Sequence, residues 1–248
     1  MTISTPLRLA VWSGPRNIST AMMRSWGNRP DTFVCDEPFY AHYLHTTRKP
    51  HPGIDEVIAA GETDWRKVVA WLTGPVPEGK SIFFQKQMTH HLLPHISRDW
   101  LEYVTNCFLI RHPRDVLRSY TKIVDKPTAE DAGFPQQAEI FDWVCRHTGK
   151  TPPVIDAVDV RNRPREILGA LCDTVGVAFQ ESMLSWSPGL RPTDGAWAKY
   201  WYKEVETSTC FRPIDPKSGS AEPLPDWLNE VYEKCLEFYE KLYSHRLT

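Results

Sequence analysis

The sequence predicts an α/β protein built on a parallel sheet of about five strands, with helices on both faces. Five short apolar runs recur along the chain, helical patterns follow several of them, and 248 residues suit one domain. The runs cover residues 7–12, 32–35, 81–85, 107–110 and 154–158. Ligands of such sheets bind at the carboxyl ends of the strands, so the residues that follow these runs are the candidates for chemistry.

Helices are predicted from periodicity and from residues that favour helix ends. Ser19 is the expected N-cap of the first helix, and Pro113 begins the second at a favoured first-turn position. Residues 45–53 are expected to form a loop. The segment 185–225 is rich in Pro, Gly and Trp, which is typical of a functional loop such as a lid. The helices are predicted over residues 20–26, 113–123, 163–175 and 226–243.

Composition excludes several classes of protein. The net charge of −2 argues against a nucleic-acid binder, and 41% hydrophobic with 24% charged residues argues against disorder. The six cysteines form no CxxC pair, so we predict no metal site and a reducing compartment. There is no basic leader and no apolar stretch of roughly 20 residues, so we expect a cytoplasmic protein without a membrane partner. A homo-oligomer is left open.

The loop after the first strand carries a candidate anion site. A helix N-terminus presents unpaired N–H groups that attract phosphate. Gly14 permits a tight turn, Arg16 offers a fork of donors, and Ser19 and Thr20 add hydroxyls at the helix start. The Walker pattern GxxxxGK[ST] is absent, which disfavours an ordinary magnesium–nucleotide site. The alternative is a capped turn with a surface arginine.

A second basic segment covers residues 108–120 (FLIRHPRDVLRSY). It resembles the 3′-phosphate-binding segment of sulfotransferases that use 3′-phosphoadenosine 5′-phosphosulfate (PAPS), with Arg111 and Ser119 at the binding positions. The first loop is similar to that family's 5′-phosphosulfate loop, often written PRSGTT. Ile18 stands at its usual Gly, and a strand-end salt bridge is the alternative role of Arg111. The matching loop residues are Pro15, Arg16, Asn17, Ile18, Ser19 and Thr20.

Three weaker similarities follow in the order of the family. Residues 85–91 resemble its strand-ending Lys with a following His. Residues 163–179 resemble the late helix of many bacterial members. Arg191 lies in a stretch that resembles a late loop closing over the nucleotide. Residues 36–39 and the N-terminal half look like the sulfotransferase-like domain fused to some branched-chain aminotransferase-like proteins. The resemblance implies a P-loop NTPase-like sulfotransferase fold for residues 1–248 as a single domain, with 185–225 lid-like and a C-terminal helix over 226–243.

The implied activity is metal-independent transfer of a sulfuryl group from PAPS to a hydroxyl or amine of a small-molecule acceptor, leaving PAP. Arg16 is the candidate for the sulfuryl group and 5′-phosphate, and Lys86 for contact with the donor or the transferred group. Glu37 is the first candidate for the general base, ahead of His90 and His91. The alternatives are a dipole-facing acid for Glu37 and a solvated strand end for Lys86.

Two other functions stay open at this point. A P-loop-related kinase would need a magnesium-binding acid, for which Asp36 or Asp115 is available. A nucleotide-binding protein without catalysis would share the fold, and Ile18 in the phosphosulfate loop is compatible with it. Three tryptophans of the irregular segment could line an acceptor pocket or pack a lid: Trp186, Trp197 and Trp201.

Overall fold

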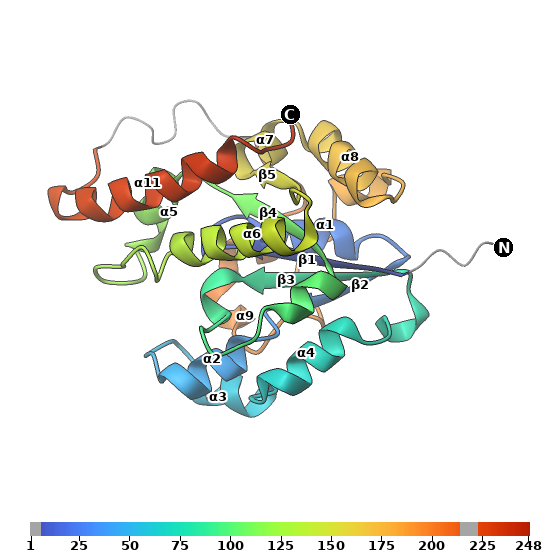
Figure 1. Ribbon diagram of the computed structural model, residues 1–248, viewed down its shortest axis with the longest axis horizontal. Coiled ribbons are helices and arrows are strands. Elements are labelled where there is room, and N and C mark those ends of the chain that lie inside the picture. Colours follow the sequence, from blue (N-terminus) through green and yellow to red (C-terminus); the bar gives the residue numbers. More distant parts are fainter. Residues whose placement is uncertain (1–5, 214–222) are drawn as a thin grey trace.

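The computed structural model describes residues 6–213 and 223–248. It confirms the predicted α/β class: five parallel strands form one sheet in the order β2-β3-β1-β4-β5 (Figure 1). Strand β1 pairs with β3 from Leu7–Ile82 to Ser13–Met88 and with β4 on its other side. The central strand therefore ends between two neighbours, which fixes where its following loop lies. The strands are β1 Leu7–Ser13, β2 Thr32–Asp36, β3 Ile82–Met88, β4 Thr105–Ile110 and β5 Val154–Asp156.

The connections between the strands are helical, as parallel pairing requires. The α-helices are α1 Ser19–Gly27, α2 Tyr40–Thr47, α3 Ile54–Ala60, α4 Trp65–Thr73, α5 Pro113–Tyr120, α6 Phe134–Thr148, α7 Ala157–Asn162, α8 Pro164–Val175, α9 Ala198–Trp201, α10 Lys203–Glu206 and α11 Asn229–Tyr243. Short 3₁₀ turns cover Pro77–Gly79, Thr89–His91, Asp99–Tyr103, Glu181–Leu184 and Asp226–Leu228.

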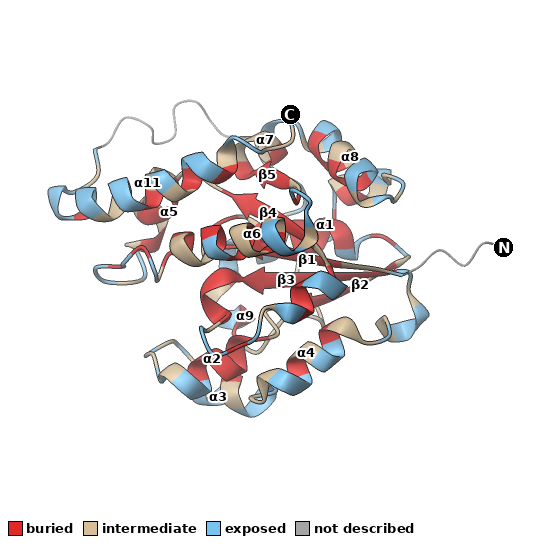
Figure 2. Cartoon of the chain, in the orientation of Figure 1, coloured by how far each residue is buried: buried red, intermediate tan, exposed pale blue. Residues whose placement is uncertain are grey.

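The sheet separates two apolar cores because successive side chains of a strand point to opposite faces. Ala10 and Trp12 of β1 lie in the core covered by α4, α5, α6 and α11. Leu9 and Val11 lie in the other core, with α1 and α8. Figure 2 shows the strands almost wholly buried between these layers. Burial on both faces explains why the strands appear in the sequence as continuous apolar runs.

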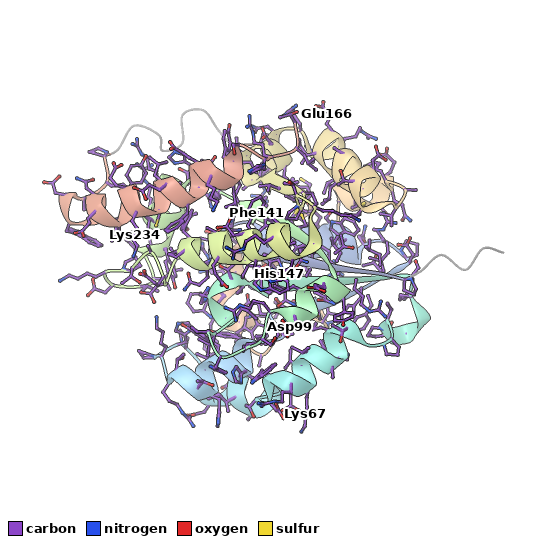
Figure 3. The ribbon with its side chains drawn as sticks, viewed as in Figure 1. Lys67, Asp99, Phe141, His147, Glu166 and Lys234 are labelled. Atoms are coloured by element: carbon purple, nitrogen blue, oxygen red, sulfur yellow. The ribbon has the colours of Figure 1, made fainter. Side chains whose placement is uncertain are left out.

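Helices α6 and α11 close the first core. Phe141 of α6, labelled in Figure 3, packs edge-on against Phe108 of β4 with ring centroids 5.3 Å apart. Tyr239 of α11 donates a hydrogen bond to the buried Asp156 at the end of β5 (3.0 Å). The C-terminal helix therefore ties the edge of the sheet to the core, as its amphipathic pattern indicates.

Several predicted boundaries were wrong: β3 continues to Met88 and α11 begins at Asn229, in addition to the following differences. Strand β5 stops at Asp156 because its carboxylate accepts from the Val158 N–H and caps α7, so 154–158 is not all strand. Helix α2 continues through Thr47 into the expected loop, and α5 ends at Tyr120 before residue 123. Ile18, without a side-chain cap, occupies the N-cap position of α1 that was assigned to Ser19.

The late segment 185–225 contains the short helices α9 and α10 and an isolated bridge from Ser185 to Cys210. Residues 214–222 of that expected lid lie outside the described residues. Arg24 of α1 makes two hydrogen bonds to the Asp194 carboxylate, at 2.5 and 2.6 Å, with both side chains 3% exposed. Buried bidentate pairs fix geometry, so this pair attaches the late segment to the first helix.

A stability prediction follows from Gly14, the residue directly after β1. Its backbone packs against the segment that precedes α6. A Cβ at this position would lie 2.3 Å from the Ala132 backbone oxygen, too close without a backbone shift. We expect Gly14→Ala to lower the free energy of unfolding by about 1–3 kcal/mol in urea titrations. Gly169→Ala in α8 is the control, because no atom of the described chain lies within 4 Å of its added Cβ. It should raise stability by roughly 0.5–1 kcal/mol, and equal effects of the two changes would contradict the prediction.

Candidate active site

A cleft of about 760 Å³ opens at the carboxyl ends of the strands. Its size is that of a site for a small molecule or cofactor. Loops after β1, β2, β3 and β4 meet there, as expected for a parallel sheet, and the late segment forms a further wall. Its cationic lining is Arg16, Lys86, Arg111, Arg118, Lys122, Arg161 and Arg212. Its carboxylates are Glu37, Asp115 and Glu204, so positive charge predominates in a chain of net charge −2.

Two segments far apart in the sequence meet at one end of this cleft. Arg16 donates its Nε–H to the Ser119 hydroxyl (2.9 Å), and Arg111 donates to the Arg16 carbonyl (2.7 Å). Asn17 donates to the Leu109 carbonyl (2.8 Å), which ties the same loop to β4. The predicted phosphosulfate loop and the predicted 3′-phosphate segment therefore form one continuous surface.

The loop before α1 adopts an unusual backbone. Arg16 and Ile18 both lie in the left-handed region, with φ of 60° and 49°. This region favours glycine, and a β-branched side chain there is an outlier that costs on the order of 1–3 kcal/mol. Ile18 thus takes a glycine-like conformation at the position where the resembled loop has Gly. Such strain is typical of loops whose backbone is shaped for a ligand.

Arg111 lies in a group of cations whose mutual repulsion is only partly compensated by nearby acids. Burial lowers the pKa of its guanidinium, and nearby Arg161 and Arg16 lower it further, while Asp115 opposes them. An anion would relieve this repulsion. Arg161 was missed by sequence reasoning, although its helix α7 directly follows β5 and so begins at the carboxyl edge. Arg212 was missed because nothing in the irregular segment shows where the chain returns to the cleft.

Glu37 lies at the other end of the cleft, in a buried cluster of charge. The Lys86 ammonium donates to a carboxylate oxygen of Asp36 (2.8 Å) and to Glu37 Oε1. Burial raises the pKa of Glu37, Lys86 opposes the rise, and the Asp36 charge adds to it. Burial acts to lower the pKa of Lys86, but the two carboxylates outweigh it and raise that pKa well above its usual range. Glu37 is thus an ionisable acid of raised proton affinity at the edge of the cleft.

His90 and His91 follow β3 and face the same end of the cleft. Burial lowers the pKa of His90 to about 3 and that of His91 well below its ordinary value. The Nδ1 atoms of both rings are buried and have no hydrogen-bond partner within the described residues. His91 Nδ1 lies 3.9 Å from Glu37 Oε2. Burial therefore disfavours the charged form of both rings, and their unpartnered Nδ1 atoms are enclosed by the protein.

Aromatic rings enclose the space around Glu37. Tyr40 stacks on His91 with centroids 4.6 Å apart, and Trp197 meets Tyr40 edge-on at 5.0 Å. Trp201 and His51 complete this wall of the cleft. Two of the three tryptophans in question thus line the cleft, whereas Trp186 packs against Phe211 in the second core.

The structure brings most of the expected site residues into this one cleft. Two do not line it. Gly14 packs against Ala132, and Arg191 donates to the Ser187 carbonyl in the late segment (2.8 Å). The residues that do line it are Pro15, Arg16, Asn17, Ile18, Ser19, Thr20, Glu37, Lys86, His90, His91, Arg111 and Ser119.

Two general features bear on the kind of site. Within residues 6–213 and 223–248, no three His, Cys, Asp or Glu side chains are grouped as a metal site would need. In the same part of the chain, no helix has the length and apolar character needed to cross a membrane.

The fold and the cleft define an α/β protein with a predominantly cationic cleft at the carboxyl ends of its parallel strands. A family described as "Sulfotransferase domain" matches residues 7–246. The chain therefore belongs to the sulfotransferase-domain family. Solved structures show the same fold: the sulfotransferase domain of the Synechococcus PCC 7002 olefin synthase has a TM-score of 0.59 at 19% identity, covering 97% of this chain and 95% of that one. A sulfotransferase from Alicyclobacillus acidocaldarius has a TM-score of 0.57 at 12% identity, covering 98% of each.

Curated relatives come from Arabidopsis thaliana. Branched-chain-amino-acid aminotransferase-like protein 1 is 35% identical over 237 residues, and protein 2 is 33% identical over 234. Each alignment covers 94% of this chain but 41% of the relative. The chain thus spans about two-fifths of their length, in agreement with the predicted resemblance to a fused sulfotransferase-like domain.

The buried histidines predict a pH dependence of stability. The pKa of His90 is about 3 in the folded protein, against an ordinary value of 6.5. A depressed histidine pKa means that the unfolded chain binds the proton more readily, so stability is fully present above pH 6.5 and is lost as the pH falls toward 3. We expect the unfolding free energy to fall by about 1.4 kcal/mol per pH unit for this group over that range.

Urea unfolding between pH 7 and pH 5 measures this slope. His90→Gln should make the slope of unfolding free energy against pH shallower, because one proton fewer is taken up on unfolding when the titrating group is removed. His147→Gln, at an exposed position of α6 labelled in Figure 3, should leave it unchanged. Parallel curves for the wild type and His90→Gln would show that His90 does not titrate as described.

Proposed function

We propose that this chain transfers the sulfuryl group of PAPS to a hydroxyl or amine of a small-molecule acceptor and releases PAP. The observation that carries the proposal is the contact between the two resembled segments. Arg111 and Ser119 both bond to Arg16, so donors for a 5′- and a 3′-phosphate lie on one surface. A single ligand with anionic groups at both positions matches that surface.

The donor end fits such a ligand by charge and by backbone direction. The N-terminus of α1 carries a partial positive charge, and its first amides follow directly on the strained loop at Ile18. In the proposal, Arg16 stabilises charge on the leaving 5′-phosphate. Arg111 and Ser119 bind the 3′-phosphate, and Arg161, which also lines the cleft, adds positive charge near Arg111.

The acceptor end fits general base catalysis. The acceptor oxygen or nitrogen forms a bond to sulfur, the bond from sulfur to the 5′-phosphate oxygen breaks, and the acceptor proton leaves. Glu37 takes this proton in the proposal, since its raised pKa suits a base working near neutral pH. His91, whose buried Nδ1 lies 3.9 Å from Glu37 Oε2, stays the rival candidate for the base. In this arrangement Lys86 holds Glu37, rather than the transferred group.

The kinase alternative is less well supported. Asp36, one of its two candidate magnesium-binding acids, already accepts from Lys86 (2.8 Å) and from the Tyr202 hydroxyl (2.7 Å). The noncatalytic alternative rests on Ile18, and that residue takes the glycine-like conformation of the resembled loop. Neither alternative is favoured by an observation of its own.

Two further parts of the proposal concern context. We propose that segment 185–225 acts as a lid over the donor, because Trp197, Tyr202 and Arg212 all line the cleft. A cytoplasmic location is proposed because the six cysteines are free thiols, which suits a reducing compartment.

The donor is tested by thermal unfolding. PAP at about 100 times its Kd should raise the Tm by roughly 5–10 °C without any divalent metal. ATP with magnesium should give a much smaller rise, because the described residues offer no grouped metal ligands. A rise with ATP and magnesium alone would exclude PAPS as the donor.

Arg111→Ala supplies the matched control, with Arg146→Ala at an exposed position of α6 as the reference variant. Arg111→Ala should lose most of the PAP-induced rise, and Arg146→Ala should keep it. Arg111→Ala should weaken binding of adenosine 5′-phosphosulfate less than binding of PAP, because adenosine 5′-phosphosulfate lacks the 3′-phosphate. The affinity that adenosine 5′-phosphosulfate still loses measures the indirect effect of Arg111 through its bond to the Arg16 carbonyl.

The base is tested by Glu37→Gln, which keeps size and removes the charge. Turnover of radiolabelled PAPS on the best acceptor from a library of small alcohols, phenols and amines should fall by about 10²–10⁴-fold. PAP binding should be unchanged, because Glu37 lies at the other end of the cleft. His90→Ala and His91→Ala are the rival variants. A Glu37→Gln enzyme with near-full turnover beside an inactive His variant would move the base to that histidine.

A further inference from the structure

We infer that Tyr202 of the late segment is a positioning residue for Glu37, acting through Asp36 and Lys86. The inference rests on the proposed role of Glu37 as the base. It makes the late segment part of the acid–base machinery, in addition to a wall of the cleft.

The Tyr202 hydroxyl lies at the centre of the buried charge cluster. It is 2.8 and 2.7 Å from the two carboxylate oxygens of Asp36, and it accepts from the Lys86 ammonium (2.8 Å). Trp197 donates its Nε1–H to the same oxygen (3.3 Å). With one hydrogen to donate and lone pairs that accept, the hydroxyl donates to Asp36 and is fully used.

The Lys86 ammonium is fully used as well. It has three hydrogens to donate, and its three partners are Asp36, Glu37 and the Tyr202 hydroxyl. The side chain is 2% exposed, so water cannot readily replace a lost partner. A change at any one partner therefore moves the ammonium relative to the other two.

The balance of charge gives the direction of the effect. Lys86 holds one positive charge between the carboxylates of Asp36 and Glu37. The Tyr202 hydroxyl and the Gly195 N–H (3.3 Å) satisfy Asp36 from the other side. Without the hydroxyl, Asp36 attracts the ammonium more strongly, and Glu37 loses part of its cation. Proton binding to Glu37 then becomes easier.

The groups around Glu37 come from five elements of the fold. Among these described groups Lys86 is the cation that contacts Glu37, and the rest are a histidine, tyrosines and an acid. The groups are Asp36 at the end of β2, Tyr40 of α2, Lys86 of β3, His91 after β3, Tyr120 of α5, and Tyr202 after α9.

The position of Tyr202 depends on how the late segment is anchored. Asp194 is held by Arg24, the next residue Gly195 bonds to Asp36, and Trp197 packs on Tyr40. These contacts fix the chain on the N-terminal side of Tyr202. Seating of this segment over the cleft and the charge state of the base are therefore coupled.

The test measures the Glu37 carboxyl directly, by carbon NMR of protein labelled at glutamate. Its signal is the one that Glu37→Gln removes. Tyr202→Phe keeps the ring and deletes the hydroxyl, so it should raise the pKa of Glu37 by about one unit. Asp36→Asn removes a negative charge and should lower the pKa of Glu37. Adding Tyr202→Phe to Asp36→Asn should cause little further change, because Tyr202 acts through Asp36.

The matched control is Tyr200→Phe, which changes an exposed tyrosine of α9, the helix that ends one residue before Tyr202; Tyr200 contacts Glu56. It should leave the Glu37 titration unchanged. In the unmodified protein, the ring carbon bearing the Tyr202 hydroxyl should titrate with the midpoint of Glu37, which tests the coupling even if Tyr202→Phe does not fold. A Glu37 midpoint that Tyr202→Phe leaves in place, or a Tyr202 signal that does not follow it, would overturn the inference.

Turnover separates this inference from the proposed function. Activity should be lost as the pH falls through the pKa of Glu37, and Tyr202→Phe should move that limb upward by about one pH unit, with about tenfold slower turnover below it. PAP binding should be unchanged. If Glu37→Gln stays active while the NMR midpoints shift as described, the base assignment fails and the coupling stands. If Glu37→Gln is inactive and the midpoints do not shift, the base stands and the coupling fails.

Discussion

The buried ammonium of Lys86 joins parts of the chain that are far apart in sequence. It holds Asp36 and Glu37 at the end of β2 and the Tyr202 hydroxyl from the late segment. Breaking a buried, hydrogen-bonded ion pair leaves a charge unpaired, which is strongly unfavourable. The acceptor end of the cleft therefore keeps its shape only while all these groups stay together. The neutral histidines and the aromatic wall are arranged around this cluster.

The donor end depends on a different constraint, the geometry of the loop before α1. Arg16 bonds to Ser119, Arg111 bonds to the Arg16 carbonyl, and Ile18 adopts a left-handed conformation between these contacts. Residual strain at Ile18 is offset by the surrounding hydrogen bonds and by packing against the second core. Both groups of residues line one cleft, and in the proposed function the transferred group lies between Arg16 and Glu37.

Membership of the sulfotransferase-domain family covers almost the whole chain, from residue 7 to residue 246. The Arabidopsis relatives carry the same region as two-fifths of a longer protein. The described site is compatible with that modular use, because its residues all come from this one region.

The sequence by itself determined the class of fold and most of the site. Continuous apolar runs indicated buried parallel strands, and the positions after them indicated Arg16, Glu37, Lys86, His91 and Arg111, because the carboxyl ends of parallel strands share one edge of a sheet. The apolar runs did not predict where each strand ends, because local capping sets some of these ends, such as the early end of β5 at Asp156.

Only the tertiary structure decided which polar groups pair with one another. Sequence reasoning predicts that Lys86 contacts the donor or the transferred group; the structure shows which protein groups its ammonium contacts, namely Asp36, Glu37 and Tyr202. Tyr202 and Arg212 were missed because an irregular segment has no periodicity that shows where it returns. Arg191, which the resemblance favoured, bonds within that segment instead. Periodicity records which face of an element is buried, whereas charge pairing depends on distances across the fold, and those are set only when the segments pack together.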